Sequence, residues 1–114
     1  MGKYEESARL MHKQGNTCSY SIYNAFLDDY KLDGEYPKPR SIDGKCGAVL
    51  TTERILKELG MEKYIEQYEK EFLEKFGYVK CVDLMKNDRR CNDYIGFSAN
   101  KIEEIINKEG ITCQ

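Results

Sequence analysis

The stretch MEKYIEQYEKEFLEKF, residues 61–76, decides the fold class of this chain. Its apolar side chains recur at intervals of three and four residues, with Glu and Lys between them, as in a helix that buries one face. The apolar positions are Met61, Tyr64, Ile65, Tyr68, Phe72, Leu73 and Phe76. Gly77 follows at once, and glycine commonly ends a helix. The stretch therefore predicts an amphipathic helix that packs against the rest of the chain.

Apolar spacing of the same kind predicts further helices on both sides of this stretch. The predicted helices cover residues 3–14, 18–30, 46–59 and 92–109, with a short helical turn at 81–86. No segment alternates as a strand does, and no internal repeat is present. At 114 residues the length fits one domain. The sequence thus predicts an all-α fold, a single-domain bundle of five to six helices spanning residues 1–114.

One long connection interrupts this helical pattern. The segment KLDGEYPKPRSIDGK, residues 31–45, contains both prolines of the chain and two of its nine glycines. Connections in compact domains run to about 4–6 residues, and much longer ones often carry function. We therefore expect a loop over about 31–45 that delivers a functional residue to the helix after it.

The charge and hydropathy of the chain exclude several classes of partner. The net charge is −2, whereas phosphate binding requires a basic excess or a basic stripe. No run of apolar residues approaches the ~20 that span a bilayer. We therefore expect no nucleic-acid partner, no membrane partner and a cytoplasmic location. Thiols stay reduced in that compartment, so several cysteines there indicate metal ligands or redox groups.

Four of the five cysteines fall where a helix is predicted to begin. Cys18 follows Asn-Thr, a pair suited to a helix N-cap, and Cys46 opens the helix after the long loop. Cys81 precedes the short turn, and Cys91 precedes the last helix. Only Cys113, near the C-terminus, is placed differently. This shared position is the main functional signal in the sequence.

A helix N-terminus suits a thiolate. Its unpaired N–H groups and the positive end of the helix dipole favour an anion, and a neighbouring cation adds to the effect. Such sites lower a cysteine pKa below its usual value of about 8.5. Lys45, Lys80 and Arg90 each directly precede a cysteine. A buried cysteine can also serve simply as a small apolar residue, and no CxxC motif is present.

These residues resemble a known family of redox-active proteins, named for its C_GCAxxG_C_C cysteine pattern. The resemblance covers nearly the whole chain, through GNTCSYSIYNAF, then CGAVLT, then KCVDL and RCNDYI. It places Cys18, Cys46, Cys81 and Cys91 at the four cysteine positions of the family, with Gly47 and Ala48 as supporting residues. Cys113 has no counterpart, and Thr51 stands where the pattern has its last glycine. Related domains in a cytochrome setting are associated with an iron–sulfur cluster.

Three hypotheses follow for the four cysteines. The first is that they converge as ligands of one iron–sulfur cluster, the usual four-thiolate arrangement, and that the protein transfers electrons to a redox partner protein. The second is a metal-free dithiol–disulfide carrier in which two of the four cysteines react. The third is a zinc site with four cysteine ligands that only stabilises a small helical interaction module.

Overall fold

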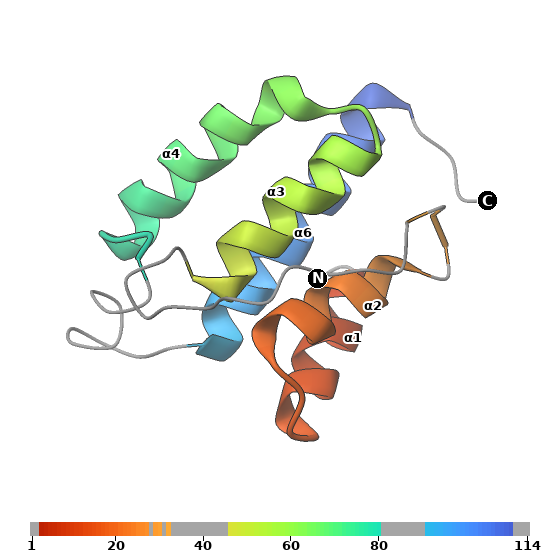
Figure 1. The fold of residues 1–114 in the computed structure, drawn as a ribbon, viewed down its shortest axis with the longest axis vertical. Coiled ribbons are helices and arrows are strands. Elements are labelled where there is room, and N and C mark those ends of the chain that lie inside the picture. The colour runs from red at the N-terminus through yellow and green to blue at the C-terminus, as the bar shows by residue number, and fades with distance from the viewer. Residues whose placement is uncertain (1–2, 28, 31, 33–45, 81–90, 111–114) are drawn as a thin grey trace.

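A computed structural model describes residues 3–27, 29–30, 32, 46–80 and 91–110 (Figure 1). The elements are α1 (Lys3–Lys13), α2 (Cys18–Leu27), α3 (Gly47–Glu58), the 3₁₀ turn η1 (Glu62–Tyr64), α4 (Ile65–Phe76) and α6 (Cys91–Glu109). The predicted all-α fold is confirmed. Most of the predicted loop at 31–45 and the whole of the predicted turn at 81–86 lie outside the described residues.

The observed helix ends follow the sequence signals closely. Gly77 adopts the left-handed conformation (φ 85°) and donates its N–H to the Leu73 carbonyl, which closes α4. Thr17 caps α2, because its hydroxyl accepts the Tyr20 N–H at 3.1 Å. Two boundaries differ from the prediction by more than one residue. The helix predicted to reach residue 30 ends at Leu27, and the one predicted from 61 begins as a 3₁₀ turn before α4.

The helices pack in three groups (Figure 1). α3 and α6 occupy the middle of the bundle, α4 covers one side of them, and α1 with α2 covers the other. α1 runs antiparallel to α6, since Arg9 contacts Asn92 while Glu5 lies farther along α6 near Asn100. α3 and α6 run parallel, and both begin at the same end of the bundle.

Aromatic rings fill much of the core. Phe72 is fully buried between α4 and α6, and four other rings have centroids within 6.1 Å of its own: Tyr68, Phe76, Tyr94 and Phe97. A second group on α1 and α2 contains Tyr4 stacked on Phe26, with Tyr30 beside both. Leu73 was predicted on the buried stripe but is 47% exposed, because it lies on the outer flank of α4.

None of the described helices is long and apolar enough to cross a membrane.

Candidate functional site

The structure describes three of the four cysteines that the sequence singles out. Cys18 is the first residue of α2 and Cys91 the first residue of α6, and both are half-buried. Cys46 occupies the N-cap of α3 with extended backbone angles (φ −53°, ψ 142°) and is 5% exposed. Each of the three is thus confirmed at a helix start. Cys81 and Cys113 lie outside the described residues.

The starts of α2 and α3 are in direct contact. The Ser19 hydroxyl donates to the Gly47 carbonyl at 3.4 Å, so the residues next to Cys18 and Cys46 touch. Gly47 is half-buried, whereas Ala48 is fully buried and anchors the first turn of α3 in the core. The contact brings together two cysteine-bearing segments that are far apart in the sequence.

A second contact joins Cys46 to the chain beyond α4. The backbone N–H of Cys46 donates to the Val79 carbonyl at 2.8 Å. Val79 stands two residues before Cys81 in the sequence. The start of α3 therefore contacts a segment that leads into another of the four cysteines.

The start of α6 is fastened to α1 by side chains. The Asn92 amide accepts a hydrogen bond from Arg9 Nη1 at 2.8 Å and donates to the Arg9 carbonyl at 3.2 Å. Its nitrogen also lies 3.3 Å from His12 Nδ1. Cys91, the residue before Asn92, is held close to the end of α1 and hence to the turn that leads to Cys18.

We call this region the cysteine end: the starts of α2, α3 and α6, together with Val79. Three helix N-termini lie there, and the positive end of each helix dipole favours anionic sulfur within its own first turn. Cys18, Cys46 and Cys91 form no disulfide with one another. Among the described residues, no three Cys, His, Asp or Glu side chains gather so as to hold a metal ion. The predicted convergence of all four cysteines stays a prediction.

A buried polar cluster lies behind Cys46. The Tyr68 hydroxyl is 2.7 Å from the Ser98 hydroxyl and also hydrogen bonds to Thr52, which donates to the Ala48 carbonyl at 2.8 Å. Complete burial raises the pKa of Tyr68 well above its ordinary value, so the phenol stays protonated. Cys46 contributes to the same upward shift of the Tyr68 pKa, but less than burial does. The core next to the start of α3 therefore contains buried, hydrogen-bonded hydroxyl groups.

Thr51 stands where the resemblance would place the last glycine of the pattern. Its side chain is fully buried, and its hydroxyl has no hydrogen-bond partner among the described residues. A buried hydroxyl without a partner is destabilising, since it loses its hydrogen bonds to water and gains none. The bundle thus accommodates a larger side chain at this position, at some cost in stability.

Thr51→Val is expected to raise the free energy of unfolding by about 1 kcal/mol, because the methyl group replaces an unpartnered hydroxyl of similar size. Thr52→Val provides the matched control. The Thr52 hydroxyl is partnered, so its loss should lower the free energy of unfolding by about 1–2 kcal/mol. Urea denaturation of both variants measures the difference. Equal destabilisation by the two substitutions would contradict this account of Thr51.

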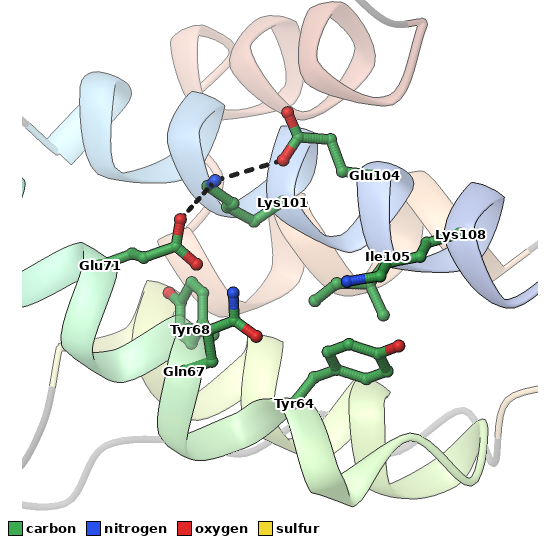
Figure 2. Close-up of a pocket in the computed structure, with 8 residues that line it drawn as sticks. All are labelled: Tyr64, Gln67, Tyr68, Glu71, Lys101, Glu104, Ile105 and Lys108. Atoms are coloured by element: carbon green, nitrogen blue, oxygen red, sulfur yellow. Dashed lines mark hydrogen bonds and ion pairs between the residues drawn. The ribbon is translucent and has the colours of Figure 1, made fainter.

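Figure 2 shows a small pocket between α4 and α6, with a volume of about 120 Å³. Lys101 lies within it between two carboxylates, 2.8 Å from Glu71 and 3.2 Å from Glu104, and the hydrogen bond to Glu71 holds the Lys101 pKa above its ordinary value. The ring of Tyr68 lines this pocket while its hydroxyl belongs to the buried cluster. Sites for organic ligands begin at about 300 Å³, so this pocket is too small for a cofactor.

Sequence reasoning missed the side chains that position the start of α6. The Glu5–Arg9 pair has the i,i+4 spacing of a helical ion pair and was readable from the sequence. The contacts of Arg9 with Asn92 and of Tyr68 with Ser98 join residues at least 30 positions apart. No local sequence pattern predicts contacts of that kind, because they depend on which helices pack together.

Comparison with protein-family models, with curated proteins and with solved structures finds no match for this chain. The resemblance to the C_GCAxxG_C_C family therefore rests on the quoted motifs alone, and membership of that family stays a prediction.

Proposed function

We propose that this protein is a thiol-based redox protein that works through Cys18, Cys46, Cys81 and Cys91. One observation carries the proposal. Cys46 is buried at a helix start, next to a contact with the Cys18 segment on one side and with Val79, close in sequence to Cys81, on the other. A thiol with two such neighbouring segments can form a disulfide within the protein.

Dithiol–disulfide exchange is the chemistry that these pairwise contacts favour. Cys18 is half-buried and more exposed than Cys46, so it is the thiolate that attacks the disulfide of a partner protein. The attack forms a mixed disulfide and releases the first partner thiolate. Cys46 then attacks the Cys18 sulfur, forms the Cys18–Cys46 disulfide and releases the second partner thiolate. Two electrons pass to the partner, and a cellular dithiol of lower potential restores the reduced form.

An iron–sulfur protein is the second candidate. The observation that favours it is the gathering of several cysteine-bearing helix starts at the cysteine end, since such clusters take four thiolate ligands. Cys18, Cys46, Cys81 and Cys91 would hold the cluster, and the cluster would supply one-electron transfer to a redox partner protein. Cys18, Cys46 and Cys91 alone do not form a metal-holding group, so this candidate also depends on Cys81.

Anaerobic purification followed by metal and thiol analysis tests the proposal. For a dithiol carrier, the protein is colourless and metal-free, and its reactive thiols decrease by two on mild oxidation and return with dithiothreitol. Cys46→Ser should abolish this change, whereas the matched control Cys113→Ser should leave it intact. A brown protein with stoichiometric iron favours the iron–sulfur candidate instead. Stoichiometric zinc without redox change, or thiols that never oxidise, would overturn the redox proposal.

Gly47→Val is expected to impair the chemistry without unfolding the helix. Gly47 is half-buried beside Cys46, and a β-branched side chain there would crowd the contact with Ser19. Helix α3 should persist because Ala48, Val49, Ile55 and Leu56 still bury its inner face. Circular dichroism should therefore match the parent, while disulfide formation slows by about tenfold or more.

The control is Gly60→Ala, which alters a glycine at the far end of α3 and away from the cysteines. It should strain the backbone, since Gly60 has a positive φ of 75°, yet leave the rate of disulfide formation unchanged. Parental thiol chemistry in Gly47→Val would mean that Gly47 serves only in packing.

A further inference from the structure

A larger pocket lies between α1, α4 and α6, on a face built from the first and last described helices. Its volume is about 400 Å³, within the range of small-molecule sites. Both charge signs and aromatic rings line it, whereas Lys101 in the pocket of Figure 2 is already paired with Glu71 and Glu104. The larger pocket has the size and the mixed chemistry of a ligand site.

Glu5 forms part of the wall, and its carboxylate is only partly hydrogen-bonded. Its side chain is 6% exposed, and one carboxylate oxygen accepts the Arg9 Nε–H at 2.9 Å. The other oxygen is buried and has no hydrogen-bond partner among the described residues. Buried carboxylate oxygens normally accept hydrogen bonds, because an unpartnered one is costly. Glu5 therefore contributes a buried negative charge behind the wall, held by Arg9.

Arg9, which like Glu5 is on α1, links this wall to α6. Its Nη1 donates to Asn92 and lies 3.3 Å from a carboxylate oxygen of Asp93. Its guanidinium rests against Gly96, where any added Cβ would collide with it. The half-exposed Asp93 carboxylate thus adds a second negative charge to the pocket, and the bare backbone of Gly96 keeps the arrangement compact.

The α4 side supplies a cation and aromatic surface. The Lys75 ammonium lies 5.9 Å from the ring centroids of both Phe76 and Phe97. Within the residues that the structure describes, no carboxylate pairs with it. Asn100 also lines the pocket. This side offers a donor for a carboxylate and a flat apolar wall.

We propose that the pocket binds a small zwitterion, a free α-amino acid with an apolar or aromatic side chain. Its ammonium group would bind to the half-exposed carboxylate of Asp93, its carboxylate to Lys75, and its side chain would lie on Phe97. The charges favour a ligand that has both groups. A plain anion would meet Asp93, and a plain cation would meet Arg9 and Lys75. The proposal is independent of the thiol chemistry.

Titration of the full chain with free phenylalanine, followed by NMR, tests this site. The backbone amides of Gly96 and Asn100 are expected to shift and to saturate at ligand concentrations on the order of millimolar. Two analogues each lack one charge: phenylalaninamide has no carboxylate, and hydrocinnamate has no ammonium group. Each should bind about tenfold more weakly, since one charge-assisted contact is lost.

Paired variants keep the test falsifiable. Lys75→Met should weaken phenylalanine binding about tenfold, whereas Lys70→Met, on an exposed face of the same helix, should leave it unchanged. Both are surface substitutions that the fold should tolerate. No saturable shift at Gly96 and Asn100, equal binding of either analogue, or equal effects of the two lysine variants would each overturn the proposal.

Discussion

Phe72→Ala is expected to lower the free energy of unfolding by about 3–5 kcal/mol. Phe72 is fully buried, with four aromatic rings around it. The substitution removes a large apolar side chain and leaves a cavity that rigid rings cannot collapse to fill. It also removes the ring contacts that hold α4 against α6.

Thermal and urea denaturation, followed by circular dichroism, measure this effect. A loss of that size corresponds to a fall in Tm of roughly 12–20 °C for a domain of this length. Leu73→Ala is the matched control, because the next residue on the same helix is 47% exposed. It should change the free energy of unfolding by at most about 1 kcal/mol. Similar losses in both variants would show that the Phe72 ring cluster does not hold α4 in place.

Arg9→Met is expected to destabilise the protein by about 3–5 kcal/mol, the usual consequence of leaving one member of a buried ion pair alone. The Glu5 side chain is 6% exposed, and Arg9 provides the single hydrogen bond that its carboxylate receives from the described residues. Without Arg9 the buried charge has no compensation. Asn92 also loses a donor at the start of α6.

A double-mutant cycle separates the charge effect from lost packing. Glu5→Gln combined with Arg9→Met should recover at least about 1 kcal/mol relative to Arg9→Met alone, because the isolated charge is gone. Lys63→Met is the control, since Lys63 pairs with Glu109 in an exposed position and should leave stability nearly unchanged. Strict additivity of the Glu5 and Arg9 substitutions would contradict the buried-pair account.

The sequence predicted the helices well because their signals are local. Apolar spacing places α4, and the glycines at 15, 60, 77 and 110, all with positive φ, mark the stops. The end of α2, which was predicted at residue 30 and lies at Leu27, is explained by a contact with another helix. Asp29 accepts the Tyr4 hydroxyl at 2.6 Å and pairs with Lys3 at 2.8 Å, so its side chain is drawn toward α1. No local signal encodes that contact.

The candidate site was predictable only in part. The position of each described cysteine at a helix start follows from capping residues and periodicity, which are local. The contacts between Ser19 and Gly47 and between Cys46 and Val79 depend on how distant helices cross. Glu5 lies on a helix with a mostly polar sequence. It is buried because α6 packs over it, which is again a contact between distant segments. Sequence patterns supply the faces of helices, whereas only the packed bundle shows which faces meet.

The pairing of α1 with α6 also bears on protein synthesis. The inner face of α1, including Tyr4 and Ala8, emerges from the ribosome well before α6 does. Contacts between segments so distant in sequence slow folding, because the intervening chain must first be ordered. Until α6 has been synthesised, Glu5, Arg9 and the apolar face of α1 stay exposed to solvent. We therefore expect folding of this domain to complete only after translation has passed α6, with chaperones shielding the incomplete bundle until then.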